Sequence, residues 1–258
     1  MASELVIREV KAGIWTFSTP FMRNGVVPFG GRSTACKLKD GSVFLVASTK
    51  ADDETLTKIR EIGPVKNADH CGVCSSGVSV RYIIAPDFEH YLNLKDFHKA
   101  FPDAKVIGVD GLEQKPALAE VKFAGIYGKD PEGTKYGFED EISACYFSAF
   151  KNKDVAFCHH ASKTLVEADL LLNMPPREQY SKTKQSPIGW IPILSYVAPF
   201  TWSHKFFISG LVNDTEVTKV HAKTVESWDF DTIIPCHGDV VEGNGKAAWQ
   251  SVWDKYLH

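Results

Sequence analysis

The sequence predicts an α/β fold in which two β-sheets pack face to face and helices cover their outer faces, a four-layer αββα sandwich. Two observations lead to this prediction. Strand-like runs rich in Val, Ile, Phe and Tyr occur in both halves of the chain, and each half also carries segments with helical spacing of apolar residues. No stretch of Gly, Ser or Pro composition separates the halves, so we expect residues 1–258 to form a single domain.

The first strands are predicted near the start of the chain. Residues 5–17 alternate loosely between apolar and polar positions and are rich in β-branched and aromatic side chains. Residues 33–38 and 42–47 flank Asp40-Gly41, a pair typical of a hairpin turn because glycine readily accepts a positive φ. Further strands are expected at residues 78–85, 105–109, 142–150, 155–159, 164–172 and 232–235.

Helices are predicted from capping residues and from apolar side chains at helical spacing. The first follows Asp52 or Asp53, carries the apolar residues Leu56, Ile59 and Ile62, and ends at Gly63-Pro64. Others are expected at residues 94–100 and 215–228, and a closing helix carries Trp249 and Trp253. For the helix capped by Asp214, the predicted apolar face consists of Val217, Val220, His221, Val225 and Trp228.

Composition excludes several classes of partner. The net charge of -3 gives no support for binding a polyanion, so no nucleic acid is expected. No apolar run is long enough for a membrane span, and Glu4, Arg8 and Glu9 interrupt any secretory signal, so we expect a cytoplasmic protein with no membrane partner. Three of the six cysteines, Cys36, Cys145 and Cys158, stand in apolar contexts and are predicted to be core residues.

Acidic and imidazole side chains recur where predicted strands end. Asp87, Glu89 and His90 follow the strand at 78–85, and His159, Asp169 and His237 stand at or near the ends of three others. A rigid sheet fixes groups at such positions while solvent can still reach them, which suits metal binding or catalysis. His159 or His237 taken alone is more often structural, and Asp87 alone is typical of a turn or cap.

Three segments resemble the metallo-β-lactamase superfamily. Residues 233–241, Ile-Ile-Pro-Cys-His-Gly-Asp-Val-Val, resemble its last metal-binding segment, and residues 164–171 resemble the strand that carries its metal-bridging Asp. Residues 82–92 stand where the superfamily has His-x-His-x-Asp-His, but here the segment contains Pro-Asp-x-Glu-His. The chain thus resembles a divergent branch, and the resemblance implies a metallo-β-lactamase-like αββα sandwich over most of its length.

Carried over residue by residue, the resemblance implies a rewritten metal site. Ala85 replaces the first His of the motif, Asp87 the second and Glu89 the Asp, whereas His90 is retained and His159 matches the third-motif His. Glu89, His90, Asp169 and His237 would form one site, and Asp87, His159 and Asp169 a second. Zinc is the first expectation, and the many carboxylates make Mn²⁺ or Fe²⁺ the alternatives.

The implied activity is that of a metal-dependent hydrolase, in which a metal-bound hydroxide attacks an ester, lactone or thioester. Asp87 or Glu89 would orient the water or carry its proton, and Tyr91 would stabilise the oxyanion. The alternatives are a metal-free binding protein with the same fold and an iron-dependent oxygenase. His160 is expected to face solvent, because neighbouring strand residues point to opposite faces.

Two further segments are open to more than one interpretation. Residues 175–200 form a long segment rich in Pro and aromatic residues, in which Tyr180, Trp190 and Tyr196 would bind a partly apolar small-molecule substrate; additional core or a homodimer contact is the alternative. Cys71 and Cys74 form a Cys-x-x-Cys pair that suits a redox dithiol or half a zinc knuckle, or else lies in a surface insertion.

Overall fold

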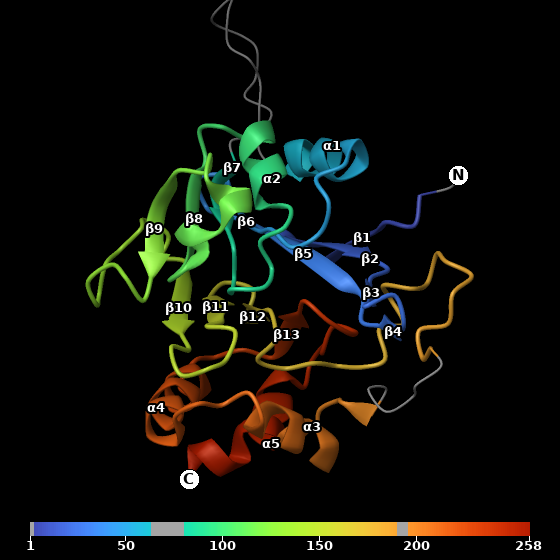
Figure 1. Cartoon of the computed structure of the whole chain (residues 1–258), viewed down its shortest axis with the longest axis vertical. Coiled ribbons are helices and arrows are strands. Elements are labelled where there is room, and N and C mark those ends of the chain that lie inside the picture. The colour runs from blue at the N-terminus through green and yellow to red at the C-terminus, as the bar shows by residue number, and fades with distance from the viewer. Residues whose placement is uncertain (1–2, 63–79, 190–195) are drawn as a thin grey trace, which may run out of the picture.

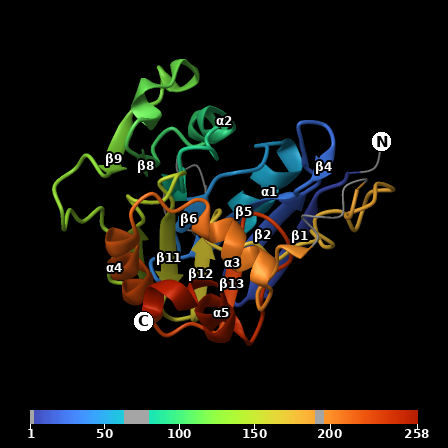
Figure 2. The same ribbon diagram turned by 60° about the horizontal axis from the view of Figure 1, so that its bottom comes forward.

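The computed structural model describes residues 3–62, 80–189 and 196–258. Two mixed β-sheets lie between two groups of helices, which confirms the predicted four-layer αββα arrangement (Figure 1). Helices α1 (Asp53–Ile62) and α2 (Leu94–Ala100) lie over the first sheet. Helices α3 (Trp202–Ser209), α4 (Thr215–Glu226) and α5 (Gly245–Leu257) cover the second sheet on the opposite side of the molecule (Figure 2).

Within the described residues the first sheet has seven strands, in the order β1-β2-β5-β6-β7-β8-β9. Their bounds, in sheet order, are β1 (Val6–Lys11), β2 (Ile14–Thr19), β5 (Gly31–Lys37), β6 (Val43–Val46), β7 (Val80–Ile84), β8 (Lys105–Val109) and β9 (Phe123–Tyr127). The short pair β3 (Met22–Arg23) and β4 (Val27–Pro28) stands apart, and the 3-10 turns η1 (Leu112–Gln114) and η2 (Pro116–Leu118) follow β8.

The second sheet has four strands in sequence order among the described residues. They are β10 (Ile142–Tyr146), β11 (Val155–His159), β12 (Thr164–Glu167) and β13 (Thr232–Pro235). The first three pair antiparallel, whereas β12 and β13 run parallel, with Glu167 opposite Pro235. The carboxyl ends of β12 and β13 therefore lie together, along one edge of the sheet formed by strand ends. The carboxyl end of β11 lies along the opposite edge.

Local sequence signals account for most of these elements. The Asp40-Gly41 turn joins β5 to β6 with Gly41 at φ +81°, and the Asp52 carboxylate accepts a hydrogen bond from the Thr55 amide at the start of α1. The predicted helix α2 and strands β8 and β11 are confirmed with their bounds. Strand β9 and helix α3 were not predicted. Strands β10 and β12 end earlier than expected.

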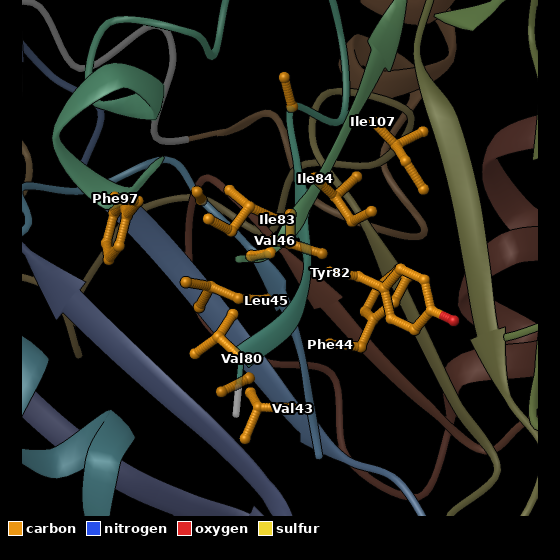
Figure 3. Close-up of a cluster of buried hydrophobic side chains, with 14 of the residues drawn as sticks. Val43, Phe44, Leu45, Val46, Val80, Tyr82, Ile83, Ile84, Phe97 and Ile107 are labelled. Atoms are coloured by element: carbon orange, nitrogen blue, oxygen red, sulfur yellow. The ribbon is translucent and has the colours of Figure 1, made fainter. Parts of the chain in front are cut away.

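The core between the sheets follows the two-residue alternation of strands. Figure 3 shows Phe44 and Tyr82 on one face of the first sheet and Leu45 and Ile83 on the other, where Phe97 of α2 packs. Phe44 reaches the second sheet, with its ring centroid 5.2 Å from that of Phe157. Cys36 belongs to this core, and Cys145 and Cys158 lie in the core under α4 and α5, as predicted.

The apolar face predicted for the helix after Asp214 is wrong in part. Val217 and Val220 are exposed, whereas Thr218, Ala222 and Val225 are buried. The helix packs against α5, whose fully buried Trp249 and Trp253 fill the interface, and small residues on α4 leave room for these rings. No helix among the described residues combines the length and apolar character that a membrane span requires.

Candidate functional site

Strand ends from both sheets bring polar side chains to one edge of the sandwich. The turn after β7 carries Asp87, Glu89 and His90, and Asp169 and His237 lie just beyond the ends of the parallel strands β12 and β13. A backbone hydrogen bond joins the two sheets there: the Val155 amide of β11 donates to the Pro86 carbonyl, which follows β7, at 2.9 Å. The positions of the site residues are thus fixed by both sheets.

Asp87 organises the turn and holds the His90 ring. Its Oδ1 accepts hydrogen bonds from the backbone amides of Glu89 at 2.9 Å and His90 at 2.7 Å, a pattern typical of an aspartate in a turn. Its Oδ2 lies 2.8 Å from His90 Nδ1. Asp87 is fully buried, and both of its oxygens are engaged within the turn. This geometry suits an outer partner that orients a ligand imidazole better than the expected water-activating group.

The imidazoles of His90 and His237 face one another with Nε2 atoms 3.0 Å apart. His237 Nδ1 lies 2.7 Å from the Gly30 carbonyl, which can only accept, so this nitrogen carries a proton. His90 Nδ1 likewise donates to the Asp87 carboxylate. In the neutral tautomers both Nε2 lone pairs then point at each other, an arrangement that requires a cation between them, either a proton or a metal ion.

A carboxylate and a thiol complete the cluster. Asp169 Oδ1 lies 3.4 Å from His237 Nε2. The ligand atoms of His90, Cys236 and His237 all lie within 4.8 Å of one another, and so do those of Asp87, His90 and Asp169. Two imidazoles, a thiol and a carboxylate form a donor set that zinc prefers, so the residues fit this metal. The expected donor set was rich in oxygen, and the nearby Cys236 thiol adds a sulfur ligand that favours zinc over Mn²⁺ or Fe²⁺.

The two imidazoles have opposite titration behaviour. Burial alone would lower the pKa of His90, but the neighbouring charges of Asp87, Cys236 and Asp169 outweigh it and hold this pKa well above the ordinary value. The pKa of His237 lies well below the ordinary value, because the ring is buried and because the positive charge of His90 lies beside it. His237 is therefore neutral with a free Nε2 lone pair, as a metal ligand must be.

Buried carboxylates surround these rings. Burial raises the pKa of Asp169 to about 6, and it raises the pKa of Asp154 well above the ordinary value, with the charges of Asp87 and Asp169 adding to the effect. Asp154 Oδ2 accepts a hydrogen bond from the Asp169 amide at 2.6 Å, and Asn152 Nδ2 donates to Asp169 Oδ2 at 2.5 Å. Such a concentration of buried acids is stabilised by a neighbouring cation.

Asn152 and Asp154 were missed by the sequence analysis, although a signal for them exists. They precede β11, which is joined to β12 by four residues, and such a short connection requires antiparallel pairing. The start of β11 therefore shares an edge with the end of β12, where Asp169 lies.

The same pairing corrects the prediction for His159. This residue ends β11 opposite Thr164, the first residue of β12, so it lies at the edge of the sheet remote from Asp169 and His237. Its Nδ1 bonds to Ser162 Oγ at 2.8 Å, and burial lowers its pKa. His159 is thus a buried structural residue, and its neighbour His160 is exposed, as expected.

Two other predicted site residues lie apart from the cluster. Glu89 is exposed and belongs to neither group of metal-ligating atoms found among the described residues, but it lines the adjoining cleft. Tyr91 is absent from the described lining of that cleft. Lys115 Nζ lies over the Tyr91 ring, 4.0 Å from its centroid, in a cation–π contact. The predicted oxyanion role of Tyr91 is therefore not supported by its position.

A cleft of about 640 Å³ opens beside the cluster. His90, Cys236, His237 and Glu89 form part of its wall. Its other described residues combine apolar side chains with polar or charged ones, and they include Leu5, Pro20, Phe21, Leu92, Glu4, Lys50, Asp52 and Asn93. A partly apolar small molecule could therefore reach the cluster.

The predicted substrate-binding tyrosines do not line this cleft as the structure describes it. Tyr180 is buried, and its hydroxyl donates to the carbonyl of Phe21 at 2.8 Å, so it supports the wall of the cleft from behind. Tyr196 is 65 % exposed, away from the described cleft lining. Trp190 and the pair Cys71 and Cys74 lie outside the described residues.

Comparison with known proteins identifies the fold. No family model and no curated protein matches the chain. Solved structures match over nearly its whole length: a metallo-beta-lactamase from Erythrobacter litoralis has a TM-score of 0.60 at 12% identity, covering 99% of this chain and 97% of its own. One from Pontibacter korlensis has a TM-score of 0.56 at 10% identity over 98% and 99%. The metallo-beta-lactamase FIM-1 from Pseudomonas aeruginosa, in a mono-zinc form, has a TM-score of 0.55 at 10% identity over 98% and 97%.

Proposed function

We propose, from the metallo-β-lactamase fold of this chain, that the protein is a zinc-dependent hydrolase of a partly apolar small molecule with an ester, lactone or thioester bond. The fold is that of solved metallo-beta-lactamases, although the low identity carries no substrate across to this chain.

The observation that carries the proposal is the opposition of His90 Nε2 and His237 Nε2 at 3.0 Å. Each ring is fixed from behind, by Asp87 and by the Gly30 carbonyl, so that its Nε2 lone pair points into the cluster. Outer partners of this kind set the tautomer of metal-binding histidines and raise their basicity. Asp169 and Cys236 supply the remaining donors.

When bound, zinc acts as a Lewis acid and lowers the pKa of water towards neutrality. Residues of the chain supply proton transfer and substrate binding. Glu89 presents an exposed carboxylate to the cleft and accepts or returns a proton during hydrolysis. Leu5, Phe21 and Leu92 offer an apolar surface for the body of the substrate.

A metal-dependence assay tests this proposal. The protein is stripped with a chelator, reloaded with zinc, manganese or iron, and assayed against a panel of esters, lactones and thioesters. We expect hydrolysis to disappear on stripping and to return with zinc, and Glu89→Gln to lower kcat about 10²- to 10⁴-fold as removal of a proton-transfer group does. Hydrolysis that persists without metal contradicts the proposal. An activity lost under anaerobic conditions identifies an oxygenase instead.

The same pair of imidazoles supports a second candidate, a metal-free binding protein. A proton on His90 would satisfy both Asp87 and His237 without a metal ion, and the charges around His90 favour its protonated form. In that case the cleft would bind a ligand with no turnover. Binding of zinc by the wild-type protein at micromolar or lower concentration, measured by competition with a chromophoric chelator, separates the two candidates.

A further inference from the structure

The loop Pro235–Gly238, which carries Cys236 and His237, is held by side chains from remote parts of the chain. Arg32, on β5, donates from Nη1 to the Pro235 carbonyl and to the Gly238 carbonyl, both at 2.7 Å. One guanidinium nitrogen thus bridges the carbonyls on either side of the two candidate ligands. Arg32 is 1% exposed, so water does not compete for these contacts.

Gln179 grips the same loop from a second direction. Its Nε2 donates to the Cys236 carbonyl at 2.8 Å, and its Oε1 accepts from the Gly238 amide at 3.0 Å. The side chain is fully buried. Gly30 makes this approach possible, because a Cβ there would lie 2.0 Å from Gln179 Oε1. Gly30 also offers the carbonyl that fixes His237 Nδ1, so the loop and the ring are restrained together.

The guanidinium of Arg32 is balanced by Glu178, the residue before Gln179. Arg32 Nη2 lies 3.1 Å from Glu178 Oε1, and Arg32 Nε donates to Ser18 Oγ at 3.0 Å. Arg8 lies 2.9 Å from the other Glu178 oxygen. A buried cation is unfavourable unless its donors are paired, and here the pairing uses the two loop carbonyls. A lysine could not replace all of these contacts, because its ammonium has three donors on one nitrogen, whereas the Arg32 guanidinium contacts Ser18, Glu178 and both loop carbonyls from three nitrogens.

We infer that Arg32 and Gln179 are positioning residues, which hold the loop Pro235–Gly238 in its metal-binding conformation before a metal ion arrives. Their side chains act through the backbone of Pro235, Cys236 and Gly238. The backbone carbonyl of Arg32 also accepts a hydrogen bond from Cys236 Sγ at 3.5 Å, which orients the thiol. Holding the loop in advance removes the cost of ordering it on binding. This inference rests on the proposed metal site.

The test compares Arg32→Lys and Gln179→Met with the wild type and with Arg81→Lys. Arg81 serves as the matched control, because it forms an exposed ion pair with Asp40. Three properties are measured: zinc affinity by chelator competition, the visible absorption spectrum of the cobalt-loaded protein, and hydrogen exchange at the Gly238 amide in metal-free protein. Circular dichroism and the unfolding midpoint report the fold.

Arg32 and Gln179 are called the clamp residues, and Arg32→Lys and Gln179→Met the clamp variants. We expect each clamp variant to bind zinc about 10- to 100-fold more weakly, which is the usual effect of losing a residue that orients a metal ligand. Zinc affinity should be unchanged in Arg81→Lys. The Gly238 amide should exchange faster and the cobalt spectrum should change, effects that a merely lower global stability would not produce in folded, loaded protein. If Arg32→Lys does not fold, Gln179→Met decides.

Wild-type affinity and an unchanged Gly238 exchange rate in folded clamp variants overturn the inference and leave the proposed function standing. If the wild-type protein itself binds no zinc, the proposed function fails, and with it the metal-binding purpose of the clamp. The two failures are therefore distinguishable from one set of proteins.

Discussion

His90 Nε2 lies 3.0 Å from His237 Nε2, although 147 positions separate the two residues in the chain. His90 stands in the turn after a strand of the first sheet, and His237 follows a strand of the second. Because the Nδ1 atoms of both rings are engaged, with Asp87 and with Gly30, neither ring can turn without losing a hydrogen bond. The closure of the two sheets at this edge therefore determines the distance between the candidate ligands.

Removing either of two central donors should abolish metal retention. His237→Ala deletes an imidazole ligand and Asp169→Ala deletes a carboxylate, and we expect each variant to keep its fold but to retain no zinc through gel filtration. His160→Ala is the control, because His160 is exposed and its side chain hydrogen-bonds only to Ser143 among the described contacts. Equal zinc content in all three variants, measured by elemental analysis, would contradict the assignment of these ligands.

His159→Ala distinguishes the structure from the expectation based on family resemblance. Because His159 lies at the remote edge of its sheet, its loss should leave zinc affinity unchanged. The variant should instead lower the free energy of unfolding by about 1–3 kcal/mol, since it removes the hydrogen bond that the buried His159 ring makes to Ser162. Denaturant unfolding and chelator competition measure the two effects. A large drop in zinc affinity without a loss of stability would place His159 in the metal site after all.

Asp87→Asn should weaken metal binding without removing a ligand. The Asn carbonyl can still accept the amides of Glu89 and His90, so the turn is preserved. The amide group cannot accept from His90 Nδ1, and the tautomer that presents Nε2 is no longer favoured. We expect a loss of zinc affinity of about 10- to 100-fold. Unchanged affinity in a folded Asp87→Asn protein would show that the carboxylate does not orient His90.

His204 predicts a loss of stability in acid. Burial lowers its pKa from 6.5 to about 4, and its neutral Nε2 accepts the Leu172 amide at 3.1 Å. As the pH falls below 6.5 the unfolded chain takes up a proton that the folded protein does not. The stabilisation is therefore full above pH 6.5 and is lost progressively as the pH falls towards 4, by at most about 3 kcal/mol.

Urea unfolding of wild type and His204→Gln over this pH range isolates the effect of His204. Glutamine retains an acceptor for the Leu172 amide but does not titrate, so the difference in unfolding free energy between the two proteins should change between pH 6.5 and 4. Parallel stability curves for the two proteins would show that His204 is not held neutral.

The sequence predicted the fold well because the relevant signals are local. The Asp40-Gly41 turn, the caps at Asp52 and Asp214 and the alternating strands each depend on a few neighbouring residues. His90 and His237 were found because each follows a strand that the pattern identifies, and Asp169 because it stands near the end of another predicted strand. The face of α4 was predicted wrongly because packing against the large rings of α5 selects small residues, which apolar spacing alone does not reveal.

The rest of the site depends on how strands pair, which residue types do not encode directly. His159 was placed in the site by resemblance, whereas the short connection to β12 puts it at the opposite edge. Cys236 was noted only as part of the segment 233–241 and not as a ligand, because whether its thiol faces the cluster depends on the path of the loop that Arg32 and Gln179 hold. Buried Asp154 becomes relevant only once β11 is known to start beside Asp169.

The most direct test of the metal site is elemental analysis of the purified, tag-free protein, with each metal counted per chain. We predict at least one equivalent of zinc, retained through gel filtration and lost on treatment with a strong chelator. Protein that contains no metal, and that takes up none after incubation with zinc, manganese or iron, would contradict the account and would favour a binding protein in which a proton joins His90 to His237.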